Sequence, residues 1–103
     1  MSQNRVELGT KLKTVLGNNN TYFQPPENLV MKYPCARYKL DGYRQRHANN
    51  DVYMYEKRYV ITFITTDPDN DYYDSMMRTF TYCRFDRSYI SGNLYHYVFT
   101  VYY

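Results

Sequence analysis

Residues 52–66 read VYMYEKRYVITFITT and form the longest strand candidate in the chain. β-Branched and aromatic residues favour strands, and successive side chains of a strand alternate between its two faces. This alternation assigns one face to Tyr53, Tyr55, Tyr59, Ile61 and Phe63. Val60 and Ile64 fall on the other face, so we expect the inner end of the strand to be buried on both sides.

The residues that follow predict a helix and two further strands. Asp67-Pro68 is expected to begin the helix, because Asp caps helix N-termini and Pro is favoured at the first helical position. The apolar stripe of this helix would contain Tyr73, Met76, Met77 and Phe80. We then expect a short strand over 82–89, a turn over 90–93 and a last strand over 94–103. The last strand places on one face Tyr95, Tyr97, Phe99 and Val101.

The first third of the chain predicts a helix over about 2–16, a polar connector over 18–32 and a strand over 33–40. The helix is predicted from the spacing of four apolar residues that would share one face: Leu8, Leu12, Val15 and Leu16. Gly17 stands at the position of a glycine that ends a helix. Gly9 is interpreted as tolerated within the helix, at about 1 kcal/mol relative to Ala; a close packing contact is the alternative. In the strand, one face carries Ala36, Tyr38 and Leu40, and the other carries Arg37 and Lys39.

Residues 41–51, DGYRQRHANND, have turn signals at both ends. They indicate a hairpin with a long protruding tip between the strands over 33–40 and 52–66. Arg44, Arg46 and His47 would make this tip basic.

The predicted order is helix, strand, strand, helix, strand, strand. We therefore expect one α+β domain over residues 1–103, with both helices packed on one face of a four-stranded, mostly antiparallel sheet. The other face would be rich in Tyr and charge, and an exposed aromatic face indicates a partner.

Composition supports a folded domain that assembles with other proteins. The chain has 103 residues and 15 Tyr, a residue type enriched at protein interfaces. A net charge of +3 is too small to predict a nucleic-acid-binding protein. No apolar run approaches the ~18 residues that a membrane span needs, and the first residues contain no continuous apolar core of a signal peptide. Without such a signal, Cys35 and Cys83 are expected to be reduced thiols.

Two constellations could carry chemistry, and neither is complete. Asp67, Asp69 and Asp71 have the spacing that opens a calcium loop, but position 12 holds Arg78 instead of Glu. The helix start explains these carboxylates with fewer assumptions. A Cys83–His96–Asp86 cluster is conceivable on adjacent strands, but Cys83 and Asp86 would point to opposite faces. We therefore expect no enzyme, no metal and no cofactor.

Mixed aromatic and basic residues on a sheet are also typical of RNA-binding sheets. Residues 57–63, KRYVITF, lack the glycines of the usual RNA-binding string. A small nucleic-acid-binding sheet domain is therefore retained as an alternative of a different class.

Three longer runs resemble small proteins encoded among the head–tail joining genes of tailed bacteriophages. They are TYFQPPENLVMKYPCARYKLD (21–41), ITFITTDPDND (61–71) and YCRFDRSYISGNLYHYVFTVYY (82–103). More narrowly, they look like the tail-terminator, or tail-completion, group. The resemblance covers nearly the whole chain from Thr21 onward, and its motifs are descriptive rather than catalytic.

The resemblance implies a small α/β fold and a structural virion protein. Tail terminators form a hexameric ring that caps the tail-tube protein, stops its polymerisation and docks the tail to the head portal complex through the head-completion, or stopper, protein. Genomic DNA would pass through the lumen without sequence-specific binding. The protein would be assembled in the cytoplasm of the host bacterium and reside in the virion neck, with no membrane and no cofactor. Another ring-forming head–tail connector protein remains an alternative.

A ring subunit needs unlike surfaces that join it to its neighbours. The predicted interface residues come from the connector, the hairpin and the outer strands: Tyr22, Phe23, Tyr43, Arg44, Arg46, His47, Tyr53, Tyr55, Arg84, Arg87, Tyr95 and Tyr97. The Arg44–His47 tip is the candidate for an axial contact, and a lumen-lining position is the alternative. Asp86 and Arg87, next to Arg84 and Lys57-Arg58, are expected to form cross-strand ion pairs.

Overall fold

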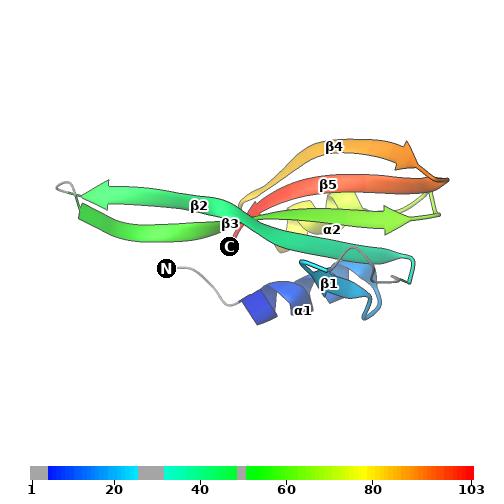
Figure 1. Ribbon diagram of the computed structural model, residues 1–103, viewed down its shortest axis with the longest axis horizontal. Helices are drawn as coiled ribbons and strands as arrows, with labels where there is room; N and C mark the ends of the chain where they lie inside the picture. Colours follow the sequence, from blue (N-terminus) through cyan, green and yellow to red (C-terminus); the bar gives the residue numbers. More distant parts are fainter. Residues whose placement is uncertain (1–4, 26–31, 49–50) are drawn as a thin grey trace.

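The computed structural model describes residues 5–25, 32–48 and 51–103, and excludes the side chains of 45–48 and 51–55 (Figure 1). Its elements are α1 (Arg5–Leu16), β1 (Thr21–Phe23), β2 (Cys35–Ala48), β3 (Asp51–Thr65), α2 (Tyr72–Thr79), β4 (Cys83–Ser91) and β5 (Leu94–Tyr102). The strands form one five-stranded sheet in the order β1-β2-β3-β5-β4. The β1–β2 pair is parallel and the other pairs are antiparallel. The α+β class is confirmed.

The predicted four-stranded sheet was wrong by one strand, because β1 lies within the expected connector. β1 pairs with β2 from Thr21↔Ala36 to Phe23↔Tyr38. At the two ends of this ladder, the Ala36 N–H donates to the Asn20 carbonyl at 2.9 Å and the Gln24 N–H donates to the Tyr38 carbonyl at 2.8 Å. A three-residue strand has too little alternation to be recognised locally, and its hydrogen-bond partner lies 15 residues further along the chain.

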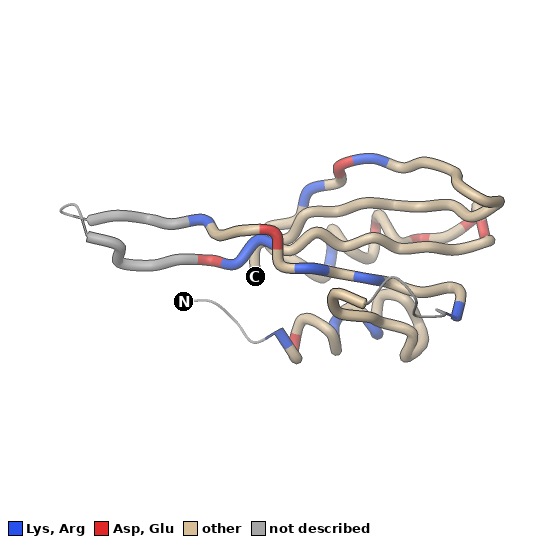
Figure 2. Tube along the Cα trace, in the orientation of Figure 1, with Lys and Arg blue, Asp and Glu red and all other residues tan. Residues whose placement is uncertain are grey.

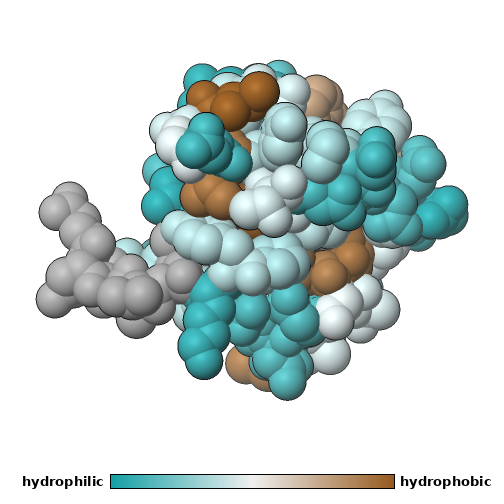
Figure 3. All heavy atoms as spheres, turned by 90° about the vertical axis from the view of Figure 1, so that its right-hand side faces the viewer, coloured by the Kyte–Doolittle hydropathy of each residue, from teal (hydrophilic) through white to brown (hydrophobic). Residues whose placement is uncertain are grey.

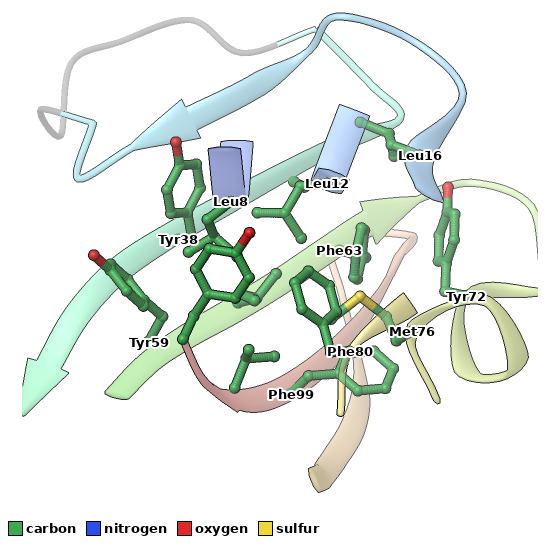
Figure 4. Packing of buried hydrophobic residues seen from close by; sticks show 14 residues of the cluster. Leu8, Leu12, Leu16, Tyr38, Tyr59, Phe63, Tyr72, Met76, Phe80 and Phe99 are labelled. Carbon is green, nitrogen blue, oxygen red and sulfur yellow. The ribbon is translucent and has the colours of Figure 1, made fainter. Parts of the chain in front are cut away.

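Both helices pack on the same face of the sheet, as predicted (Figure 4). α1 buries Leu8, Leu12 and Leu16, and α2 buries Tyr72 and Met76. They meet one layer of strand residues, which includes Tyr38, Tyr59, Ile61, Phe63, Phe99 and Val101. Phe63 occupies the centre of this layer, since its ring lies 4.7 Å from that of Tyr72 and 5.7 Å from that of Phe99.

The start of α2 and part of its stripe were predicted wrongly. Asp67 lies in a turn instead of capping the helix: its Oδ1 accepts the Asp69 N–H at 2.9 Å. The helix begins at Tyr72, after Asp71. Tyr72 is therefore buried at the i, i+4 spacing with Met76, whereas Tyr73 is 54% exposed. The local Asp turn competed successfully with an earlier helix start.

The two glycines of α1 have different outcomes. Gly17 ends the helix as predicted, with φ of 85° and its N–H donating to the Lys13 carbonyl at 2.8 Å. Gly9 is a close contact and not merely tolerated, because an added Cβ would lie 2.8 Å from the Tyr38 hydroxyl.

The predicted turn-rich stretch over 41–51 is mostly strand. β2 continues to Ala48, which pairs with Asp51, so the β2–β3 hairpin is a long two-stranded ribbon. At Asp41-Gly42, where the sequence predicted a turn, the strand continues with a shift of pairing register between Leu40 and Gly42. The distal part of the ribbon projects beyond the helices and the other strands (Figure 1), in a molecule that measures 51 × 30 × 22 Å.

The turn predicted over 90–93 is confirmed in a shorter form. Ser91 pairs with Leu94, and only Gly92 and Asn93 connect β4 to β5. Both have positive φ, 58° and 65°, which is the geometry of a type I′ hairpin turn.

Candidate functional site

The face of the sheet opposite the helices holds a groove of about 590 Å³. It runs between the β1 side, at Gln24 and Pro25, and the β4 side, at Arg87 and Tyr89. The strands between contribute Arg37, Lys39, Val60, Thr62 and Val98. Thr62 and Val98, on the floor of the groove, are only 8% and 7% exposed, although no helix of the described residues crosses this face.

The groove is basic. Arg37 and Lys39 line it from β2, Arg87 lines it from β4, and no carboxylate of a described residue lines it. The ion pairs in the described part of the chain are Arg44–Glu56, Arg58–Asp41 and Arg84–Asp86, none of which involves these three cations. The groove is therefore suited to a negatively charged partner.

The uncovered face is less rich in Tyr than the sequence predicted. Tyr59 and Tyr97 lie on the helix side. Two described tyrosines line the groove: Tyr89, and Tyr38, which belongs to the helix-side core. Alternation determines which residues share a face, but it does not determine which face the helices cover.

Asp86 joins β4 to β5 on the uncovered side. Its Oδ1 accepts a hydrogen bond from Arg84 Nε at 2.8 Å, and its Oδ2 accepts one from the Thr100 hydroxyl. A register shift between Phe85 and Arg87 leaves Asp86 without a partner residue in the ladder, which frees its side chain for these bonds. The hydrogen bond that Arg84 donates to Asp86 raises the pKa of the Arg84 guanidinium.

The predicted cross-strand ion pairs are only partly correct. Arg84–Asp86 is a pair within one strand, and Arg58 pairs with Asp41 across β2 and β3 at 3.2 Å. The expected partnership of residues 84–87 with Lys57-Arg58 is not found among the described residues, because β5 lies between β3 and β4.

No Cys83–His96–Asp86 cluster forms. The Cys83 side chain packs against the helix-side core, whereas Asp86 is bound to Arg84 and Thr100. The His96 ring stacks on Tyr89 at 4.6 Å. Burial raises the pKa of both the Cys35 and Cys83 thiols to about 11. Neither thiol is therefore a thiolate nucleophile near neutral pH.

The acidic turn before α2 serves a structural role. The Asp67 N–H donates to the Thr65 hydroxyl at 3.1 Å, and Asn70 Nδ2 donates to the Asp67 carbonyl at 3.0 Å. Among the residues that the structure describes, no group of three or more His, Cys, Asp or Glu side chains is placed to hold a metal ion.

Arg44 fastens the base of the β2–β3 hairpin to the rest of the sheet. Its Nε and Nη2 both bond Glu56 Oε1, the former at 3.1 Å. Its guanidinium also lies over the rings of Tyr102 and Tyr82, at 4.3 and 5.1 Å from their centroids. The hydrogen bond to Glu56 raises the pKa of Arg44. Arg44 thus connects β2, β3 and β5, instead of lying at the tip.

The other predicted interface residues lie in four separate places. In β1, Tyr22 and Phe23 are half-buried, and the Phe23 ring contacts that of Tyr38 at 5.2 Å. On the helix side of β5, Tyr97 meets Tyr72 at 6.2 Å and Tyr95 is also half-buried. Arg84 and Arg87 are exposed on β4, and Tyr43 is 56% exposed at the hairpin base. The remaining predictions fall on side chains outside the described set: Arg46, His47, Tyr53 and Tyr55.

The sequence prediction of site residues missed Arg37, Lys39 and Tyr89. The alternation in residues 33–40 had placed Arg37 and Lys39 on one face, but gave no sign that Arg87 would lie across a groove from them.

Comparison of the sequence with known protein families and with curated proteins found no match. Neither described helix is long and apolar enough to cross a membrane.

Proposed function

We propose that this protein is a structural protein of a phage neck, a tail terminator that forms a ring, caps the tail tube, stops its polymerisation and joins the tail to the head portal complex. The observation that carries the proposal is the β2–β3 ribbon, which extends beyond the body of the domain and is fastened at its base by Arg44. A projecting ribbon on a small body suits contacts with other subunits more than the enclosure of a substrate.

The rest of the molecule is consistent with an assembly role. Burial raises the pKa of both thiols to about 11, which keeps them protonated at neutral pH, and the histidine with a described side chain is stacked on a tyrosine. The proposed partners are further copies of this chain in a hexameric ring, the tail-tube protein and the head-completion protein. DNA would cross the lumen without base-specific contacts, and the protein would reside in the virion after assembly in the bacterial cytoplasm.

A nucleic-acid-binding sheet domain is the second candidate, because Arg37, Lys39 and Arg87 line one groove on the uncovered face. Phosphate contacts of this kind would make binding weaken steeply with salt. Another ring-forming connector of the neck is the nearest alternative to the terminator.

The proposal is tested by adding the purified protein to growing tail tubes of the cognate virus. A terminator should bind one tube end in negative-stain images and stop elongation at a stoichiometry of one ring per tube. Titration of labelled DNA at two salt concentrations is the parallel assay. Salt-sensitive DNA binding without any binding to tubes would contradict the terminator proposal and support the second candidate.

A further inference from the structure

We propose that the basic groove of one copy receives the acidic turn between β3 and α2 of a second copy. The groove is the one lined by Arg37, Lys39 and Arg87, and the name acidic turn here covers residues 67–74, which are the turn itself and the first three residues of α2. This contact rests on the proposed ring and deepens it, since it names two surfaces that join neighbouring subunits.

The groove provides positive charge beside a floor of β-branched residues. Of its three cations, Arg37 and Lys39 lie on β2 and Arg87 lies on β4, and all three residues are exposed. Val60, Thr62 and Val98 form the floor between them. Thr62 and Val98 are already nearly buried, so a partner that enters the groove would gain chiefly because its negative charges meet positive charges on two sides.

The acidic turn provides the complementary charge on the same chain. Asp67, Asp69, Asp71 and Asp74 lie within eight residues of sequence and are all exposed. None of them forms an ion pair in the described part of the molecule. Figure 2 shows acidic residues at the end of the sheet near α2, whereas the charged residues of β2 and β4 are mainly basic, interrupted by Asp41 and Asp86.

The turn is also held in one conformation, which lowers the entropy lost on docking. The Asp69 N–H is bound to Asp67 Oδ1, and the Ser75 hydroxyl donates to Asp71 Oδ2 at 3.4 Å. Figure 3 views this end of the molecule, where hydrophobic residues appear as separate spots on a mostly hydrophilic surface. Charge complementarity, and not a continuous apolar patch, is therefore the basis for recognition.

The two surfaces are unlike and occupy different parts of the domain. The groove lies on the uncovered face, whereas the acidic turn follows the end of β3 at Thr65 and leads into a helix on the opposite side. Contact between unlike surfaces repeats from copy to copy, and a closed ring results when the rotation closes. Nucleic acid fits the groove less well, because Tyr89 is already stacked on His96 and a net charge of +3 is small.

The test uses two charge-reversed forms of the full chain. A groove variant carries Arg37→Glu and Arg87→Glu, and a turn variant carries Asp69→Lys and Asp74→Lys. Lys13→Glu on α1 is the control, because Lys13 is exposed and does not line the groove. Solution mass is measured at about 50 mM and 500 mM salt, with circular dichroism to confirm folding.

Wild-type protein and the control should self-associate at low salt and dissociate at high salt, as expected for screened charges. Each variant alone should self-associate at least about tenfold more weakly, because like charges then face each other. An equimolar mixture of the two variants should recover association, since each reversed surface meets its complement on the other variant.

Two kinds of result would overturn the docking. One is a wild-type protein that stays monomeric at low salt, or variants that associate as well as wild type. The other is a mixture that fails to recover, in particular if the groove variant has lost DNA binding that wild type possesses. The tube-capping assay separates this contact from the terminator function. If the variants associate normally and still cap tubes, only this contact is refuted. If the wild-type protein does not cap tubes, the terminator function is refuted.

Discussion

Replacing Arg44 by Met should destabilise the protein by about 2–3 kcal/mol, because Arg44 fastens the base of the β2–β3 ribbon. Three contacts are lost together. The pair with Glu56 is partly screened, since the two side chains are 34% and 15% exposed, and contributes about 1 kcal/mol. Stacking on Tyr102 and Tyr82 adds roughly 0.5–1 kcal/mol for each ring. Met preserves much of the aliphatic packing, so the change reports mainly on the guanidinium.

Arg58→Met is the matched control. Arg58 also pairs with a carboxylate across β2 and β3, that of Asp41, but the side chains of this pair are more exposed, at 37% and 41%. Among the described residues, no cation–π contact of Arg58 with an aromatic ring is found. We expect a loss of about 0.5–1 kcal/mol for this variant. Urea unfolding followed by far-UV circular dichroism gives both values.

Hydrogen exchange then locates the effect. In the Arg44 variant, amide protons near the base of the β2–β3 hairpin should exchange faster than the loss of global stability explains. Exchange of the α1 amide protons should become faster only by the amount that the loss of global stability predicts. The reasoning would be refuted if Arg44→Met cost no more than Arg58→Met, or if faster exchange spread evenly over the whole domain.

Three further predictions concern the core, a turn and pH. Phe99→Ala should lower the free energy of unfolding by about 3–5 kcal/mol, because Phe99 is fully buried. Phe85→Ala should lower it by about 1 kcal/mol, because Phe85 is 36% exposed. Urea unfolding measures both values. Gly92→Ala should cost about 1–2 kcal/mol, seen as a lower Tm, because φ is +58° there. Burial raises the pKa of Cys35 and Cys83 to about 11, so the unfolded chain releases these thiol protons at lower pH than the folded protein does. The contribution of the two thiols to the free energy of unfolding should therefore be complete below pH 9 and should fall as the pH rises from 9 to about 11. Cys35→Ala should flatten this alkaline decline in pH-dependent melting, and an unchanged slope would contradict it.

Sequence periodicity alone determined the long β3 strand, the last strand β5 and the apolar face of α1. Alternation over a strand and the 3.6-residue period of a helix are local properties, so Phe63, Phe99 and Leu12 could be assigned to the core before any partner was known. The glycine that ends α1 and the two-residue turn at Gly92-Asn93 are local for the same reason, because each depends on the backbone conformation of one or two residues.

Tertiary structure alone decided the features that depend on distant partners. β1 exists because the edge of β2 offers hydrogen bonds to it, and β2 continues past Asp41-Gly42 because β3 pairs with it throughout. The basic groove arises because Arg37 and Arg87, which are 50 positions apart in sequence, line the same concave face. Local patterns specify which side chains share a face of one element, but the packing of elements against one another decides which face stays uncovered and which charges meet across it.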